Sequence, residues 1–280
     1  MQESELKALV SLLDDDDSEV SYHVEQQITS LGSEVIPFLE AQWEQSFNPE
    51  IQRRIEDLIH SLQYELLNER LLTWANSKDQ DLLEGMWIIA TYLYPDLELA
   101  QLKKEVEQIY YEVWTEFKNE LSPVDQIKIL NGVLFSKLKF KANTKNFHSP
   151  SNSMINIVLD SKRGNPITLC TIYMLVAQKL GMPVYGVNLP NMFILVYKTE
   201  EISFYINAFN RGLVFTKEDI DHYLQNINVN PDKQFYEPCE NIEFIKRSFR
   251  NLAASFEKLG EYEKMEEVKV LLNLISDEKV

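Results

Sequence analysis

The stretch that decides the fold is residues 165–189, which read NPITLCTIYMLVAQKLGMPVYGVNL. Asn165 is a favoured residue type for a helix N-cap, and Pro166 suits the first helical position, where its missing N–H costs little. Apolar side chains then continue to Leu180, and Gly181 and Pro183 are residue types that end helices. These features predict a buried helix that is followed at once by an extended segment.

Four segments after this helix are rich in β-branched and aromatic residues, as strands usually are. We expect strands at 184–189, 193–197, 202–206 and 213–215, with residues 198–201 as a hairpin loop. A helix followed by an antiparallel meander is an α+β arrangement. The predicted fold class is therefore α+β and predominantly helical, with a small antiparallel sheet.

On both sides of this segment the chain is expected to be helical. Leu6, Leu9, Val10 and Leu13 recur at the spacing of one helical face, and the short helices that follow resemble HEAT-type repeats. The last forty residues resemble one tetratricopeptide hairpin, which should pack on the core because a single repeat cannot bury its own apolar face. We predict a HEAT-like region at 1–78, a core with its preceding helices at 79–236, and a tetratricopeptide-like tail at 237–280.

The composition is that of a folded, acidic protein. Of 280 residues, 45% are hydrophobic and 25% are charged, which argues against disorder. The formal net charge of −17 repels phosphate groups, so nucleic acid and anionic membranes are unexpected partners. We expect a protein or peptide partner, with nucleic-acid contact through the basic cluster Lys137, Lys139, Lys141 and Lys145 as a weaker alternative.

Several classes of site are not expected. Neither G-x-G-x-x-G nor the P-loop pattern occurs, and a calcium loop counted from Asp14 would have Glu19 where glycine is required. His222 and Glu218 share a helical face but lack a third metal ligand. We expect no cofactor and no metal. With neither a signal-peptide pattern nor an apolar run long enough to span a membrane, we expect a cytoplasmic protein with two reduced cysteines.

Short motifs in a fixed order connect the chain to a known family. They occupy residues 140–143, 147–153, 158–169, 177–184, 186–190, 207–212 and 216–219. In this order they resemble the bacterial SirB-type family of transglutaminase-like proteins, whose tetratricopeptide tail is similar to residues 251–264. The resemblance implies a papain-like core with a Cys-His-Asp triad. The cysteine would begin the central helix, and the histidine and aspartate would lie on successive strands.

The residues that the resemblance implies for this triad are missing here. Counting back from residues 180–183, the nucleophile position falls at Pro166, or one residue to either side. The family's Pro-Gly-His-Phe stretch reads PNMF at 190–193, so Met192 replaces the base. Its Asp-Pro-Phe-Asn stretch reads NAFN at 207–210, so Asn207 replaces the orienting carboxylate. None of these three side chains can supply a thiolate, a base or a carboxylate.

Cys170 keeps an enzymatic alternative open. It lies one helical turn after Pro166 and could be a displaced nucleophile, with His148 as base and Asp160 as its orienting group. We favour a cysteine that packs as a small hydrophobe, as free cysteines usually do.

A polar groove could still remain at the former active site. Its candidate residues are Asn165, Thr168, Asn191, Asn210 and Arg211. The sequence thus favours a non-catalytic protein-interaction or regulatory module. The alternative is a cysteine-dependent acyl-transfer enzyme or peptidase that uses Cys170.

Overall fold

A computed structural model describes residues 3–13 and 17–276 of the chain. Its contacts divide the chain into two compact units, Met1–Arg70 and Leu71–Val280. Asp14, the first residue of the excluded calcium loop, lies outside the described residues. The domain boundaries expected from the sequence at residues 78 and 236 stay predictions.

The first unit is helical throughout its described part. Its elements are α1 (Glu3–Ser11), α2 (Ser18–Thr29), the 3-10 helix η1 (Ser33–Val35), α3 (Ile36–Gln45) and the greater part of α4 (Pro49–Ala75). Its buried core includes Leu13, Ile28, Leu39, Ile55 and Leu62. Leu13 lies in the turn after α1, and the other four lie on α2, α3 and α4. The HEAT-type architecture remains a prediction.

The second unit begins with helices and contains a four-stranded sheet. Its elements before the sheet are α5 (Leu82–Thr91), α6 (Leu99–Trp114), α7 (Pro123–Asn131), the π-helix η2 (Gly132–Lys137), β1 (Lys141–Ala142), η3 (Pro150–Asn152), α8 (Ile155–Ser161), β2 (Arg163–Gly164) and α9 (Pro166–Lys179). From the sheet onward they are β3 (Val184–Leu189), β4 (Met192–Lys198), β5 (Ser203–Asn207), η4 (Ala208–Asn210), β6 (Leu213–Phe215), α10 (Lys217–Asn226), η5 (Lys233–Phe235), α11 (Asn241–Leu259) and α12 (Tyr262–Leu274).

The sheet is an antiparallel meander in the order β3-β4-β5-β6, so the predicted fold class is confirmed. Two of the expected strands have the observed bounds, and each of the other two differs by a single residue at both ends. The two-residue parallel pair of β1 and β2 was not expected, because so short a ladder leaves no periodic pattern in the sequence.

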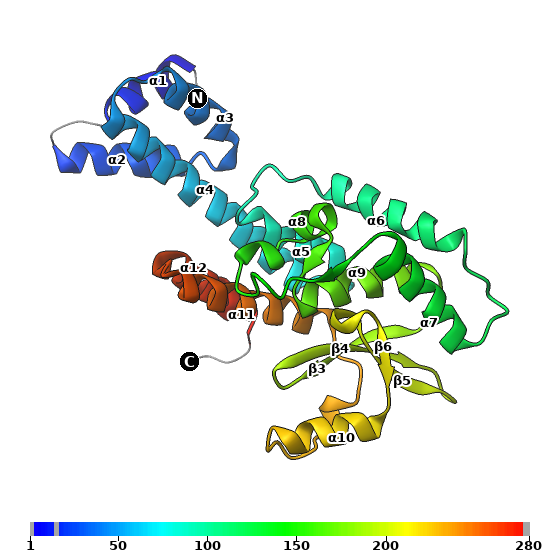
Figure 1. Cartoon of the computed structure of the whole chain (residues 1–280). Coiled ribbons are helices and arrows are strands. Elements are labelled where there is room, and N and C mark those ends of the chain that lie inside the picture. Colours follow the sequence, from blue (N-terminus) through cyan, green and yellow to red (C-terminus); the bar gives the residue numbers. More distant parts are fainter. Residues whose placement is uncertain (1–2, 14–16, 277–280) are drawn as a thin grey trace. The chain divides into compact units, whose positions relative to one another are not determined.

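Helices cover both faces of this sheet (Figure 1). On one face, α9 packs against β3 and β4. On the other face, Ile220 and Leu224 of α10 join Val187, Ile194 and Val196 in a buried cluster. Alternate residues of each strand therefore serve the two cores, as the period of two in a strand requires.

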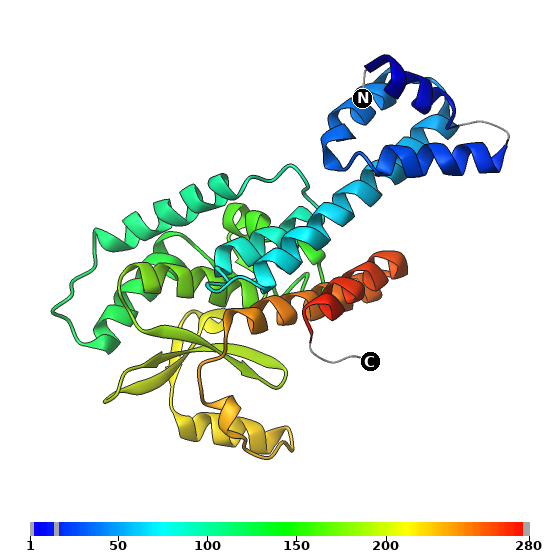
Figure 2. The same cartoon turned by 180° about the vertical axis from the view of Figure 1, so that it is seen from behind.

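The C-terminal helices α11 and α12 form a hairpin that packs on the rest of this unit, as Figure 2 shows from behind. Phe244 of α11 is fully buried, and its ring lies 4.5 Å from that of Phe193 on β4, centroid to centroid. Gly186 of β3 allows this close approach, because a Cβ there would lie 2.2 Å from the Phe244 ring. The hairpin thus shares a core with the sheet, which places one face of α11 beside the start of α9.

Candidate functional site

The start of helix α9 is held by Asn165, as the sequence predicts. The Asn165 Oδ1 accepts a hydrogen bond from the backbone N–H of Thr168 at 2.9 Å, and Pro166 occupies the first helical position. The Asn165 Nδ2 donates to the Ser153 Oγ at 3.0 Å, and the residue is only 5% exposed. Both polar atoms of this side chain are therefore engaged within the protein.

A second asparagine connects residues 143–154, the polar loop before α8, to the same helix start. The side chain of buried Asn152 donates to the carbonyls of Asn146 and Phe147 at 2.7 and 2.9 Å. Its Oδ1 accepts from Asn143, while its backbone carbonyl accepts from the Thr168 hydroxyl, both at 2.8 Å. The Asn- and Ser-rich loop is therefore ordered by its own polar side chains.

Met192 and Asn207 meet at the ends of neighbouring strands. The Asn207 Nδ2 lies 3.9 Å from the Met192 Sδ, and the Asn207 Oδ1 accepts from the backbone N–H of Asn210 at 3.0 Å. A thioether is a weak acceptor that carries no exchangeable proton, and the amide of Asn207 carries no negative charge. The two side chains touch, but together they cannot transfer a proton.

A pocket of about 230 Å³ opens where α9 begins. Four segments meet there: the polar loop, the start of α9, the β3–β4 turn and one face of α11. The lining residues are Phe147, His148, Asn165, Pro166, Ile167, Asn191, Phe193, Arg247, Asn251, Ala254 and Ser255. We call this hollow the cleft pocket.

The matching family model carries the description "Transglutaminase-like superfamily" and covers residues 100–250, just over half of the chain. That range includes α9, the whole sheet and the first half of α11. The chain belongs to the transglutaminase-like superfamily. The cleft pocket therefore lies at the start of the central helix of a transglutaminase-like core.

The relatives of this transglutaminase-like chain include bacterial and animal proteins. A UPF0162 protein of Xylella fastidiosa (strain 9a5c) is 28% identical over 201 residues, which are 69% of this chain and 71% of the relative. The UPF0162 protein YchA of Escherichia coli (strain K12) is 25% identical over 62% of this chain and 66% of its own length. The F-box only protein 21 of Mus musculus is 32% identical over 34% of this chain and 16% of its own length. No solved structure matches the chain.

Cys170 of the transglutaminase-like core lies fully buried inside α9. Its sulfur is 3.6 Å from the carbonyl oxygen of Phe193, to which the thiol can donate. Burial raises the pKa of the Cys170 thiol far above its ordinary value, and a nearby backbone hydrogen bond at Ala208 offsets only part of this effect. A thiol in these surroundings stays protonated at neutral pH.

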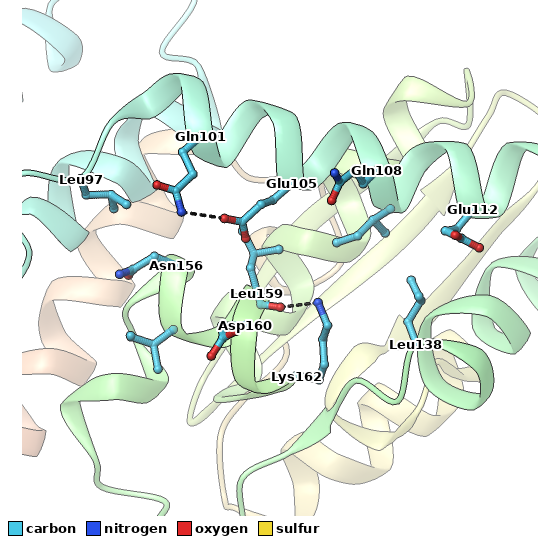
Figure 3. A pocket seen from close by; sticks show the side chains of 12 residues that line it. Leu97, Gln101, Glu105, Gln108, Glu112, Leu138, Asn156, Leu159, Asp160 and Lys162 are labelled. Atoms are coloured by element: carbon cyan, nitrogen blue, oxygen red, sulfur yellow. Dashed lines mark hydrogen bonds between the residues drawn. The ribbon is translucent and has the colours of Figure 1, made fainter.

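His148 and Asp160, the two partners that the enzymatic alternative gives to Cys170, lie in different hollows. His148 is on the rim of the cleft pocket, where its ring meets that of Phe147 edge-on at 5.3 Å. Asp160 lines a larger hollow of about 640 Å³ between α6 and α8, together with Glu105 and Lys162 (Figure 3). Among the described residues, no hydrogen bond joins Cys170, His148 and Asp160 to one another.

The structure brings together only part of the groove expected from the sequence. Asn165 and Asn191 line the cleft pocket, whereas Thr168 is fully buried beneath it. Asn210 and Arg211 are outside the lining. Arg211 has a left-handed backbone (φ 55°), and its guanidinium lies 3.5 Å from the Ser136 hydroxyl, on the η2 side. The residues after η4 turn toward η2 because they must lead the chain from β5 into β6.

The sequence-based groove omitted the wall that α11 supplies. Arg247, Asn251 and Ser255 recur every fourth residue along one face of this helix and line the cleft pocket. They lie more than fifty residues from the β3–β4 turn in sequence, so only the packing of the hairpin brings them to the site. The detectable signal was a polar stripe at helical spacing on a strongly amphipathic helix.

Other sequence candidates have ordinary surroundings. Lys137 of the basic cluster is ion-paired with Glu112 and Glu116, each at 2.9 Å. Within the described ranges, no group of three or more His, Cys, Asp and Glu side chains is arranged to hold a metal ion. No helix in those ranges is both long enough and apolar enough to cross a membrane.

Proposed function

We propose that this chain is a non-catalytic transglutaminase-like protein whose cleft pocket binds a short segment of a partner protein. The observation that carries this proposal is the contact between Met192 and Asn207. On the family resemblance, these positions belong to the base and its orienting carboxylate. Their side chains meet as such a pair would, but they contain no group that accepts and releases a proton near neutral pH.

The surroundings of Cys170 also favour a non-catalytic role. A nucleophilic cysteine needs a lowered pKa and access to its substrate. Cys170 has a raised pKa, no exposure and a backbone carbonyl as its neighbour. It is better explained as a core residue between α9 and β4.

The cleft pocket has the dimensions and chemistry of a side-chain binding site. Its volume of about 230 Å³ is below the ~300–1,000 Å³ that is usual for small-molecule sites, so it suits one or two side chains of a larger partner. Phe147 and Ala254 offer accessible apolar surface, while Asn191, Asn251 and Arg247 offer hydrogen-bond donors. A partner segment could therefore be both anchored and oriented.

A pocket-blocking variant tests this proposal. Ala254 is exposed and lines the cleft pocket, so Ala254→Trp should fill it without disturbing the core. Lys258→Trp adds the same side chain one turn further along α11, outside the lining. In affinity capture from the native cell, we expect the wild type and Lys258→Trp to retain a partner that Ala254→Trp loses. Capture of the same proteins by all three, at equal circular dichroism, would refute binding in the cleft pocket.

A further inference from the structure

Arg247 is a half-buried cation without an acidic partner in the described chain. Glu243, one turn earlier on α11, is ion-paired with Lys246 at 3.3 Å instead. The Arg247 Nη1 donates to the Asn188 Oδ1 at 3.4 Å, the one side-chain hydrogen bond of this guanidinium within the described residues. Burial, and then the neighbouring charge of Arg250, lower the pKa of Arg247, although an arginine remains charged at neutral pH. A half-buried charge without a counter-charge has lost part of its hydration, so this side chain is suited to a ligand that supplies a negative charge.

The rest of the cleft pocket is also free of negative charge. Among its described lining residues none is acidic, although the chain carries a net charge of −17. Asn251 follows Arg247 by one helical turn on α11. Asn191 lies in the β3–β4 turn, which forms another wall of the pocket, and its backbone is left-handed (φ 58°). Neither amide is engaged by another described side chain, in contrast to Asn165. The pocket therefore presents donors from two walls.

We propose that Arg247 binds a carboxylate of the partner segment, either an Asp or Glu side chain or a C-terminal carboxylate. This inference rests on the proposed function, because it names the chemistry of the group held in the cleft pocket. The planar guanidinium matches the two oxygens of a carboxylate, and its single charge balances a single negative charge. A phosphate group, with nearly two charges, would call for a second cation that points into the pocket.

The test uses fluorescein-labelled nonapeptide mixtures that differ in one group. Two mixtures have an amidated C-terminus and either Glu or Gln at the centre, a third has central phosphoserine, and a fourth has central Gln with a free C-terminal carboxylate. Binding to the full chain is followed by fluorescence anisotropy. We expect the Glu mixture or the free-carboxylate mixture to bind at least ~10-fold more tightly than the amidated Gln mixture, because a charged hydrogen-bonded pair is lost in the latter.

Two arginines on the same helix give a matched pair of variants. Arg247→Met should remove the preference for the carboxylate mixtures, while Arg250→Met, which loses the same charge at an exposed position outside the lining, should keep it. Arg247→Lys keeps the charge but not the fork and should retain part of the preference. If Arg247→Met fails to fold, Arg247→Lys still tests whether the carboxylate preference depends on this side chain.

The outcomes separate this inference from the proposed function. Equal binding of all four mixtures, abolished by Ala254→Trp, would overturn the carboxylate inference and leave peptide binding in the cleft pocket intact. Preference for phosphoserine over Glu would also overturn it. Absence of binding to any mixture by the folded protein would count against the proposed function itself.

Discussion

Replacing Asn165 with alanine should destabilise the second unit, because the start of α9 depends on this side chain. The variant removes the N-cap acceptor of the Thr168 N–H, which costs about 1 kcal/mol (range ~0.5–2). It also leaves the Ser153 hydroxyl, only 1% exposed, without its donor, at about 1–2 kcal/mol. Together these losses predict a free energy of unfolding lower by about 2–3 kcal/mol.

Urea unfolding measures this loss. Of the four tryptophans, Trp74, Trp87 and Trp114 lie in Leu71–Val280, so tryptophan fluorescence reports mainly on the second unit. The urea concentration at the unfolding midpoint should fall. The slope of the unfolding free energy against urea concentration should stay the same, because the substitution does not change the surface that unfolding exposes.

Asn165→Asp is the matched control for this variant. A carboxylate can accept from the Thr168 N–H at the positive end of the helix and from the Ser153 hydroxyl, so this variant should lose less than about 1 kcal/mol. A loss below ~0.5 kcal/mol for Asn165→Ala, or equal losses for both variants, would refute the view that hydrogen bonds of Asn165 hold the site together.

Two further predictions concern the walls of the core. Gly186→Ala places a Cβ 2.2 Å from the Phe244 ring, an overpacking that should cost about 1–3 kcal/mol and lower the Tm by several degrees. In a Phe244→Leu background the same substitution should lower the Tm by less. Gly132→Ala, whose added Cβ would have no neighbour within 4 Å, should leave the Tm unchanged in the same thermal unfolding experiment. Burial and a hydrogen bond to the Asp221 carboxylate raise the pKa of Tyr236 from 10.0 to about 12. The stability that this shift contributes is fully present below pH 10 and is lost as the pH rises through about 12. Between these two pH values the free energy of unfolding should therefore fall more steeply for the wild type than for Tyr236→Phe. Parallel pH curves for these two proteins would contradict this assignment.

The part of the fold that the sequence predicts correctly is encoded locally. Asn165 caps α9 and Pro166 occupies its first position, and Gly181, whose backbone is left-handed (φ 78°), follows the C-cap Leu180. The strands are recognisable because both faces of the sheet are covered, which calls for runs of β-branched and aromatic residues. The parallel pairing of β1 and β2 could not be predicted in this way, because two residues in each strand are too few to show a periodic pattern.

The candidate site was harder to predict because its walls come from distant segments. Asn165 and Asn191 could be named from the family motifs, whereas Arg247 enters only through the packing of α11 on the sheet. Sequence spacing placed Cys170 on the same helix face as Pro166 but could not show how deeply it is buried. His148 and Asp160 are twelve residues apart, yet α8 directs them to separate hollows.

The inertness of Cys170 is the most direct test of a non-catalytic core. Native protein is treated with iodoacetamide at pH 7.5, and alkylation of each cysteine is followed by mass spectrometry. Burial raises the pKa of the partly buried Cys239 to about 12, so its thiolate fraction should be roughly 10³-fold below that of an ordinary cysteine. Cys170, which is fully buried, should stay unmodified until urea unfolds the chain. Alkylation of Cys170 in the native state faster than that of Cys239 and of free cysteine would contradict the account, because it would reveal an activated nucleophile.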